Sequence, residues 1–409
     1  MKSLTKLYLN KAELRHANII IPGSKSESNR LIILRSLFKN ISLENISDSD
    51  DTNYLLNAIN TKSNVINVGH AGTAMRFLAS YLSLTTKANI QLIGSERMHN
   101  RPIKKLVDSL REIGANIEYM RDEGYPPLFL NPSKLRRKKL LIDGSTSSQY
   151  ISSLLLIAPK ISNGLELELI GKETSIPYIN MTISLLKKIG VEIISRNKCI
   201  KVFECQNINP IKISIESDWS SASYFYSIVA LAEIGYSLTL NKFNISSLQG
   251  DSKIVDIYKV FGVITTFQGG KIKLEKVKSK IDEFTFNLAL NPDLAQTICI
   301  TCLGLGIKCY LNGLHTLKIK ETDRLVALRN EIGKFGLKVT ISEDSISFGG
   351  KRDFLKPNVM IETYNDHRMA MAFACLAIKT NIVICDHNVV SKSYKTFWSD
   401  LNKIGILTK

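Results

Sequence analysis

The chain has 409 residues, of which 44% are hydrophobic and 22% charged, and it contains only 10 prolines. This composition excludes a fibrous or largely disordered protein, and the length predicts two or three domains. The formal net charge of +17 fits nucleic acid, an anionic membrane or small anionic substrates as partners. The apolar runs are shorter than the roughly 20 residues of a membrane span, and the N-terminus lacks the apolar core of a signal peptide, so we expect a cytoplasmic protein.

A short cluster of small polar residues that opens an apolar, helix-like stretch recurs along the chain. The clusters begin at Gly23, Ala71, Ser145, Trp219, Pro292 and Asp366. From the second cluster onward the starts advance by 73 or 74 residues, whereas the first step is only 48 residues. A fixed period of this kind is typical of a repeated supersecondary unit.

A second amphipathic helix is predicted for each repeat, because leucine and isoleucine recur at three- and four-residue spacing. The predicted ranges are 51–59, 103–113, 178–189, 253–261, 323–335 and 395–404. Four of these helices end at a glycine suited to a left-handed cap, namely Gly114, Gly190, Gly262 and Gly336. Alternating segments that follow, such as 115–119, 191–194 and 337–341, are predicted to be strands.

The repeating unit is therefore strand, helix, strand, helix, strand, strand, and it occurs six times. Six units are too many for one core and predict two domains of three units each. The short first unit predicts that its missing strand comes from elsewhere in the chain, so that one domain is discontinuous. An open solenoid is the alternative, although solenoid repeats rarely contain two helices and four strands.

Cations lie at several of the predicted helix starts. Lys25 and Arg30 follow the first cluster, Arg76 follows the second and Arg368 follows the last. Because the helix dipole disfavours a cation at a helix N-terminus, these residues predict bound phosphate or carboxylate groups. The alternative is that the small residues are ordinary helix caps and the cations are solvated.

Carboxylates accompany these cations in the second half of the chain. Segment 320–324 reads Lys-Glu-Thr-Asp-Arg, in which we expect Asp323 to pair with Arg324 and Glu321 to shuttle protons. Asp293 stands alone at its helix start, and among cations it should stay ionised, which suits a base or a hydroxyl acceptor. The sequence has no P-loop, no Gly-rich dinucleotide fingerprint and no metal-ligand motif. It predicts a protein that binds phosphorylated, carboxylated small molecules without a metal.

Several segments together resemble the EPSP synthases (3-phosphoshikimate 1-carboxyvinyltransferases), a family of enolpyruvyl transferases. They are segments 22–30, 71–76, 97–103, 147–149, 320–324 and 365–370, in this order and over nearly the whole chain. The resemblance implies an α/β (α+β) fold with two similar domains, each built from three βαβαββ units, in an inside-out barrel arrangement. It implies one domain of residues 1–21 plus 216–409, another of residues 22–215, and an active site in the cleft between them.

The resemblance also implies a reaction. The enolpyruvyl group of phosphoenolpyruvate passes to the 5-hydroxyl of shikimate 3-phosphate, in the shikimate pathway to chorismate and the aromatic amino acids. It implies that Asp293 is the base toward the hydroxyl, that Glu321 is the acid at the methylene carbon, and that Lys25 assists. The resemblance implies no cofactor and no metal. We expect the protein to be a monomer that binds its two small-molecule substrates and neither nucleic acid nor a membrane.

Site residues follow from the matching motifs. The implied shikimate 3-phosphate ligands are Lys25, Ser26, Arg30, Ser147, Ser148, Gln149, Ser175, Tyr178, Asp293, Thr316 and Lys320. The implied phosphoenolpyruvate ligands are Lys25, Gly72, Arg101, Gln149, Arg324, Arg368 and Lys395. Residues that depart from the usual family pattern are His70, Phe77, Thr316 and Trp219.

Three other functions remain as alternatives. UDP-N-acetylglucosamine 1-carboxyvinyltransferase, the related enolpyruvyl transferase, typically relies on a reactive cysteine in the first half of the chain, and this sequence has no cysteine between Met1 and Lys198. An RNA-binding protein built from similar units would use the positive charge and bind polynucleotides with steep salt dependence. A non-catalytic binder would keep the ligand affinity without turnover.

Overall fold

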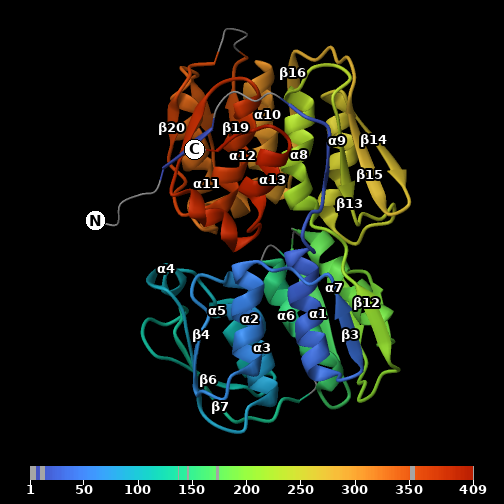
Figure 1. Ribbon diagram of the computed structural model, residues 1–409. Coiled ribbons are helices and arrows are strands. Elements are labelled where there is room, and N and C mark those ends of the chain that lie inside the picture. Colours follow the sequence, from blue (N-terminus) through green and yellow to red (C-terminus); the bar gives the residue numbers. More distant parts are fainter. Residues whose placement is uncertain are drawn as a thin grey trace. The chain divides into compact units, whose positions relative to one another are not determined.

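The computed structural model describes residues 6–9, 14–136, 138–144, 147–171, 175–350 and 355–408. The chain forms two compact units, of which unit 1 is Met1–Pro22 with Glu216–Lys409 and unit 2 is Gly23–Ile215 (Figure 1). Ser145 and Thr146, which open the third predicted repeat, lie outside the described residues. Within the ranges given above, no helix combines the length and the apolar character that crossing a membrane requires.

Unit 2 alternates helices and strands. Its helices are α1 (Lys25–Leu37), α2 (Asp50–Asn60), α3 (Gly72–Thr85), α4 (Glu96–His99), α5 (Lys104–Glu112), α6 (Ser148–Ile157), η1 (Ala158–Lys160) and α7 (Ile176–Lys188). Its strands are β3 (Ile41–Glu44), β4 (Val65–Asn67), β5 (Ile90–Ile93), β6 (Asn116–Tyr119), β7 (Leu128–Asn131), β8 (Lys139–Asp143), β9 (Leu165–Ile170), β10 (Ile193–Arg196), β11 (Cys199–Val202) and β12 (Ile211–Ser214).

Unit 1 repeats the same alternation. Its helices are α8 (Trp219–Leu231), η2 (Gly250–Lys253), α9 (Ile254–Val260), η3 (Pro292–Leu294), α10 (Ala295–Leu305), η4 (His315–Ile319), α11 (Arg324–Gly333), α12 (His367–Ala374), η5 (Cys375–Ile378), η6 (His387–Lys392) and α13 (Phe397–Lys403). Its strands are β1 (Lys6–Leu9), β2 (Ala17–Ile19), β13 (Ser237–Asn241), β14 (Val263–Gln268), β15 (Lys271–Lys276), β16 (Glu283–Asn287), β17 (Lys308–Asn312), β18 (Val339–Ile341), β19 (Ile346–Phe348), β20 (Val359–Ile361) and β21 (Ile382–Cys385).

The predicted βαβαββ unit is confirmed in the four-stranded sheets. Their strand orders are β4-β5-β7-β6, β8-β9-β11-β10, β2-β13-β15-β14 and β16-β17-β19-β18. In each sheet the first two strands are parallel and the remaining neighbours are antiparallel. A parallel pair requires a long crossover, which the first helix of the repeat supplies in three of these sheets. Between β2 and β13 the chain passes through the whole of unit 2 and then α8. The last two strands of each sheet are joined as a hairpin.

The two strands that precede α1 and α8 are exchanged between the units. Strand β2 lies just before α1 in sequence but pairs in parallel with β13 of unit 1. Strand β12 lies just before α8 but pairs in parallel with β3 of unit 2. Strand β3 therefore receives its parallel neighbour from elsewhere in the chain, as we expected for the first repeat. The short first step has a separate cause, because β4 follows α2 without an intervening hairpin and the sheet β12-β3 has two strands. The sixth repeat is completed differently, because β1 adds to β21 in an antiparallel arrangement and extends the pair β20-β21.

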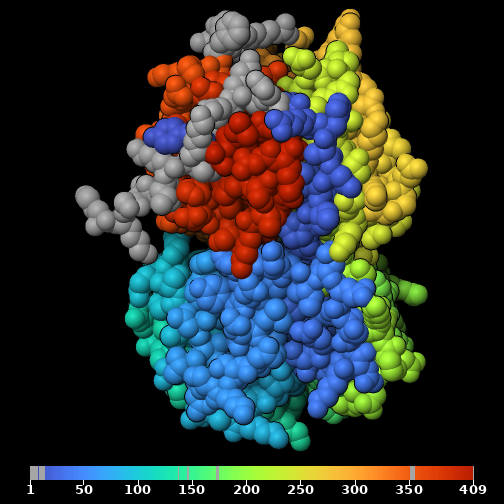
Figure 2. Space-filling view, in the orientation of Figure 1, coloured from blue at the N-terminus to red at the C-terminus, as the bar shows by residue number. Residues whose placement is uncertain are grey.

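The segment 14–22 belongs to unit 1 through contacts with residues distant in sequence. The Arg15 backbone N–H donates to the Ile404 carbonyl at 3.0 Å, and the Tyr236 hydroxyl donates to the Arg15 carbonyl at 3.1 Å. Figure 2 shows this N-terminal segment in blue on the surface of unit 1, beside the C-terminal residues in red. The crossover at Pro22 is thus anchored on one side by the sheet of β2 and by the C-terminal helix region.

The first helices of the repeats pack together inside each unit. Helices α8, α10 and α12 with η5 lie against one another in unit 1, as do α1, α3 and α6 in unit 2. Hydroxyl side chains at equivalent repeat positions meet in pairs: Ser223 with Thr297 at 3.0 Å, Thr301 with Ser227 at 2.8 Å, and Ser80 with Ser153 at 2.5 Å. Because the paired residues are 73 or 74 positions apart, neighbouring helices run side by side with their N-termini at the same end.

The predicted glycine caps can be tested by a matched pair of substitutions. Gly190 follows α7 with φ 94°, and a Cβ there would meet nothing within 4 Å, so Gly190→Ala costs only the left-handed conformation, about 1 kcal/mol. Gly333 is helical and equally unobstructed, so Gly333→Ala should be neutral or stabilising by up to about 1 kcal/mol. Urea unfolding midpoints of both variants should move apart, and equal shifts would contradict the cap.

Candidate active site

Arg324 is the centre of an ion cluster in unit 1. It opens α11 and its side chain is 2% exposed. Its Nε donates to Asp366 Oδ2 at 2.7 Å, Nη1 donates to Asp293 Oδ1 at 3.0 Å, and Nη2 donates to Glu321 Oε2 at 2.8 Å. One guanidinium therefore joins carboxylates from η3, from the segment before α11, and from the start of α12.

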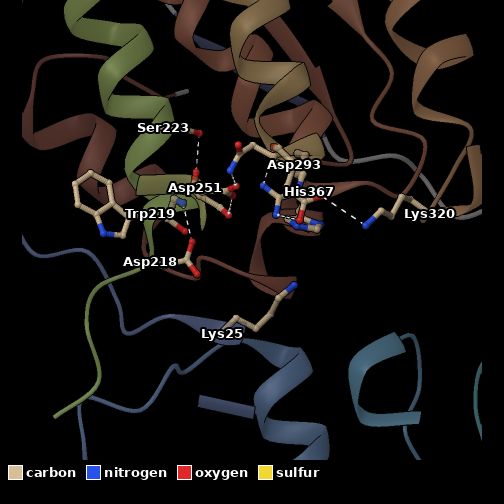
Figure 3. A network of polar contacts seen from close by, with 12 residues as sticks. Lys25, Asp218, Trp219, Ser223, Asp251, Asp293, Lys320 and His367 are labelled. Atoms are coloured by element: carbon tan, nitrogen blue, oxygen red, sulfur yellow. Dashed lines mark hydrogen bonds and ion pairs between the residues drawn. The ribbon is translucent and has the colours of Figure 1, made fainter. Parts of the chain in front are cut away.

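The same carboxylates bind further cations. Arg368 Nη2 lies 3.0 Å from Asp293 Oδ2. Lys320 Nζ lies 3.7 Å from Asp293 Oδ1 (Figure 3). Lys392 Nζ donates to Glu321 Oε1 at 2.6 Å. The predicted residues Asp293, Lys320, Glu321, Arg324 and Arg368 are thus brought together in the folded unit, and Lys392 joins them.

Burial and the neighbouring charges shift the pKa values of Asp293, Lys320 and Arg324. Burial by itself would raise the pKa of Asp293, but Arg368, Lys320 and Arg324 hold that pKa well below its usual value. Burial lowers the pKa of Lys320, against the opposing effect of Asp293. Burial would also lower the pKa of Arg324, yet its carboxylate neighbours raise it above the usual range. Asp293 is therefore a carboxylate at neutral pH, as the sequence indicated.

The aspartates at the helix starts have separate tasks. Asp323 caps α11 by accepting from the backbone N–H groups of Leu325 at 3.1 Å and Val326 at 3.2 Å. The prediction that Asp323 pairs with Arg324 is therefore wrong, because its carboxylate turns back onto the first turn of the helix. Arg324 binds Asp366 in its place, from the N-cap of α12.

A strained turn presents Asp366 and the start of α12. Tyr364 and Asn365 are consecutive residues with φ of 54° and 55°, and such left-handed residues cost on the order of 1–3 kcal/mol each. The Tyr364 hydroxyl donates to Glu331 Oε1 at 2.8 Å, and Lys334 Nζ binds the other oxygen of this buried carboxylate at 2.6 Å. Glu331, on α11, thus stabilises the turn that places Asp366.

Asp251, a residue that the sequence analysis did not select, lies beside this cluster in η2 (Figure 3). The Ser220 hydroxyl donates to Oδ2, and Asn291 Nδ2 donates to Oδ1 at 3.5 Å. Burial and the nearby charge of Asp293 raise the pKa of Asp251 to about 6. In the sequence, Asp251 is an acidic residue near the start of the second helix of its repeat. Acidic residues are common in the first turn of any helix, so its position alone did not mark it as a site residue.

The pKa of Asp251 predicts a pH-dependent stability. Because burial raises that pKa from 3.8 to about 6, the folded state binds the proton more tightly than the unfolded state. Its contribution to stability is fully present below pH 3.8 and is lost as the pH rises through about 6. We expect Asp251→Asn to become more stable relative to the parent chain between pH 5 and pH 7.5, by about 1 kcal/mol or more, in denaturant unfolding.

The matched control is Asp256→Asn on α9. Lys253 and Lys259 lower the pKa of this exposed carboxyl, so its contribution to stability is present above the ordinary pKa and no gain is expected as the pH rises. If the stability of both variants relative to the parent chain changed equally between pH 5 and pH 7.5, the buried charge of Asp251 would not destabilise the fold.

In unit 2, Lys25 has a carboxylate partner on the neighbouring helix. Its Nζ lies 3.2 Å from Asp51 Oδ2 on α2, and the Asp51 side chain is 4% exposed. The other oxygen, Asp51 Oδ1, is buried without a hydrogen bond. The anion that the helix dipole argument required for Lys25 is thus present within the protein itself.

Arg30 is buried and connects α1 to α7. Its Nε donates to Thr182 Oγ1 at 2.7 Å, Nη1 to the Ser26 carbonyl at 2.8 Å, and Nη2 to the Tyr178 carbonyl at 3.3 Å. Burial lowers its pKa to about 10. The rings of Phe77 and Tyr178 lie 5.5 and 5.9 Å from the guanidinium carbon, so Phe77 contacts a predicted ligand residue.

The other predicted residues of unit 2 lie at helix starts. Ser147 caps α6, Ser148 is buried in its first turn, and Gln149 Nε2 donates to Thr73 Oγ1 at the start of α3 at 3.2 Å. Ser175 lies at the N-cap position of α7 in a left-handed conformation with φ 53°, without a side-chain hydrogen bond to the helix. The side chains at the starts of α3 and α6 therefore meet, as the packing of these helices requires.

Gly72 and Arg101 are in close contact. A Cβ at Gly72 would lie 2.5 Å from Arg101 Nη1, so a side chain at position 72 would displace the guanidinium from where it lies. Arg101 Nε is buried without a hydrogen bond. Arg76, for which an anionic ligand was predicted, donates to the Gly72 and Pro102 carbonyls at 3.2 Å each, which uses much of its hydrogen-bonding capacity on the backbone.

Lys392, which the sequence analysis did not select, and the predicted ligand Lys395 have different surroundings. Lys395 is exposed and precedes α13, whereas Lys392 is 6% exposed and reaches Glu321. The predicted helix 395–404 begins only at Phe397, and the preceding turn of η6 directs Lys392 inward. The available signal was the apolar pair Val389–Val390 just before it, which marks a buried segment.

The remaining departures from the family pattern have plain structural settings. Thr316 lies in η4 with its hydroxyl buried and without a hydrogen bond. Trp219 is fully buried, packs against Phe243 and donates to Glu216 Oε1 at 2.9 Å, so it belongs to the core of unit 1. The His70 ring packs edge-on against the Tyr54 ring, with 5.6 Å between the ring centroids. Over the described part of the chain, no group of three or more His, Cys, Asp or Glu side chains could hold a metal ion.

Comparison with known proteins decides the family. The family model of EPSP synthase (3-phosphoshikimate 1-carboxyvinyltransferase) matches residues 55–401. A 3-phosphoshikimate 1-carboxyvinyltransferase of Bacteroides fragilis is 42% identical over 392 residues, with 95% of each chain covered. This chain belongs to the EPSP synthase family. An enzyme of the same name from Actinobacillus pleuropneumoniae is 34% identical over 437 residues, with 99% of each chain covered.

Solved EPSP synthase structures share the fold. An EPSP synthase from Acinetobacter baumannii aligns with a TM-score of 0.78 at 20% identity and covers 99% of both chains. The predicted fold class is thus confirmed as the two-domain fold of enolpyruvyl transferases. The EPSP synthase family match spans the starts of α3, α6, α10, α11 and α12, whereas the start of α1 lies before it and is covered by the full-length relatives.

Proposed function

We propose that this chain transfers the enolpyruvyl group of phosphoenolpyruvate to the 5-hydroxyl of shikimate 3-phosphate, giving 5-enolpyruvylshikimate 3-phosphate and phosphate. The relatives named above carry the name of this reaction over nearly their full length. The observation that carries the proposal is the cluster in which Asp293 and Glu321 share Arg324. It combines two proton-transfer groups with cations that match phosphate and carboxylate.

The first step is addition to the double bond. Asp293 accepts the proton of the 5-hydroxyl while the resulting oxygen attacks C2 of phosphoenolpyruvate, and Glu321 donates a proton to C3. The product is a tetrahedral intermediate that still bears the phosphate. The low pKa of Asp293 makes it a weak base while Arg368, Lys320 and Arg324 lie against it. Substrate phosphate and carboxylate groups compete for the same cations, which raises that pKa toward a useful range.

The second step is elimination. The C2–O bond to phosphate breaks, C3 loses a proton to Glu321, and the double bond re-forms in the product. Glu321 begins this step as a carboxylate, because it gave up its proton in the addition. Lys392 and Arg324 hold its two oxygens, so its position is kept through both proton transfers. The cations around the leaving phosphate stabilise the negative charge that develops on it.

The proposal divides the ligands by unit. In unit 1, Lys320, Thr316 and Asp293 bind shikimate 3-phosphate, whereas Arg324, Arg368 and Lys392 bind phosphoenolpyruvate. Thr316 has a hydroxyl ready to donate, since its Oγ1 is buried without a hydrogen bond. In unit 2, Arg101 from the segment between α4 and α5 also takes part. The helix starts of α1, α3, α6 and α7 supply the rest, namely Lys25, Ser26, Arg30, Gly72, Ser147, Ser148, Gln149, Ser175 and Tyr178.

In this assignment, residues of both units bind the same two substrates. It therefore requires both units to engage the substrates together during turnover. The proposed partners are these two small molecules alone, and we propose a cytoplasmic monomer. The alternative acting on a UDP-amino sugar is not favoured, because the relatives carry the other name and the chain has no cysteine before Cys199.

The reaction is tested by phosphate release. Both substrates together should release phosphate at a steady rate, and omission of either should abolish the release. Release from phosphoenolpyruvate alone would indicate a phosphatase and overturn the proposal. The Glu321→Gln variant should keep binding shikimate 3-phosphate in calorimetry but lose about 100-fold or more in kcat, since it cannot protonate C3.

Lys392 and Lys395 provide a matched pair at this site. Lys392→Met removes a buried cation from Glu321 and, on the proposed assignment, from phosphoenolpyruvate, so kcat/KM for phosphoenolpyruvate should fall about 100-fold or more. Lys395→Met removes an exposed charge three residues further on and should leave kcat/KM within about two-fold. If Lys395→Met lowered kcat/KM for phosphoenolpyruvate more than Lys392→Met did, Lys395 would be the ligand and the assignment of Lys392 would be wrong.

A further inference from the structure

The Pro102 carbonyl oxygen accepts hydrogen bonds from two buried side chains of different helices. Tyr150, in the first turn of α6, donates its hydroxyl at 2.5 Å, and Arg76, on α3, donates Nη2 at 3.2 Å. Tyr150 is 9% exposed and Arg76 is 4% exposed. Pro102 directly follows Arg101, so these two donors fix the backbone at that arginine.

Arg76 also binds the other side of the contact between Gly72 and Arg101. Its Nη1 donates to the Gly72 carbonyl at 3.2 Å and lies 3.3 Å from Met98 Sδ. One guanidinium therefore spans from the start of α3 to the segment that carries Arg101. The backbone N–H of Arg101 donates to the Met98 carbonyl at 3.0 Å, which closes this segment into a tight turn.

The Arg101 side chain depends on that backbone for its position. Its Nε is buried without a hydrogen bond, and its Nη1 would lie 2.5 Å from a Cβ at Gly72. The guanidinium lies directly against Gly72 and its Nε has no hydrogen bond, so a shift of the Pro102 carbonyl moves Arg101 relative to the start of α3. A ligand held by that guanidinium and by the N–H groups of α3 would feel the same shift.

We propose that Tyr150 is a positioning residue for phosphoenolpyruvate, acting through the Pro102 carbonyl on Arg101. Together with Arg76 it keeps the Arg101 guanidinium against Gly72 in the orientation that binds the substrate anion. Tyr150 also directly follows Gln149, which donates to Thr73 on α3. The first turn of α6 therefore helps to position two predicted ligands, Gln149 and Arg101. This inference rests on the proposed function, because it names the substrate that Arg101 holds.

The test is Tyr150→Phe, which removes the hydroxyl and keeps the ring. Loss of this hydrogen bond should raise KM for phosphoenolpyruvate about five-fold, with kcat and KM for shikimate 3-phosphate within about two-fold. The matched control is Tyr236→Phe in unit 1, whose hydroxyl also donates to a backbone carbonyl, that of Arg15, from a ring 8% exposed. It should lower the thermal midpoint by a comparable amount and leave KM for phosphoenolpyruvate unchanged.

Equal KM values for phosphoenolpyruvate in the parent, Tyr150→Phe and Tyr236→Phe would overturn the inference while leaving the proposed function intact. A parent chain that releases no phosphate from both substrates would overturn the proposed function itself. If Tyr150→Phe failed to fold, Arg76→Lys would decide, because a lysine cannot bind the Gly72 and Pro102 carbonyls in the same way. It should raise KM for phosphoenolpyruvate by about five-fold or more, and an unchanged KM would reject the positioning role.

Discussion

Contact between equivalent positions of successive repeats is the constraint on which the candidate site depends. Ser223 meets Thr297 and Ser80 meets Ser153 across one repeat period, so neighbouring first helices align with their N-termini at one end. Their small hydroxyl side chains let the helices approach closely and satisfy buried polar groups. Within each unit, the residues at the helix starts therefore meet although they are far apart in sequence. Without this alignment, Asp293 and Arg368 would not lie 3.0 Å apart.

Internal carboxylates balance the cations in both units. Arg324 binds Asp366, Asp293 and Glu321, and Lys25 binds Asp51. A buried cation without such a partner would carry a large desolvation cost, so the carboxylates allow the units to fold with these charges inside. The same pairs keep the side chains extended toward the helix starts, where the dipoles favour anions. On the proposed function, substrate anions then exchange with carboxylates that are already in place.

Much of the fold could be predicted from the spacing of residues along the chain, and the predictions that failed have local causes. The period, the two helices in each repeat, the glycine caps and the need for a strand from elsewhere are all consequences of short-range patterns. The exchange of β2 and β12 could not be predicted, since both are short strands that precede a first helix and either sheet would accept them by pattern. Asp323 was assigned to Arg324 because they are adjacent, but a cap to the backbone competes with an ion pair at that position.

The sequence alone determined the repeat, the positions of the helix starts and the residue types that face them, because these depend on periodicity and on the chemistry of a few neighbouring residues. Only the tertiary structure decided which side chains meet. It brought Lys392 to Glu321, turned Arg76 toward backbone carbonyls, and placed Asp251 beside Asp293. Such choices depend on distances between segments that the chain brings together only after folding, and no local pattern contains those distances.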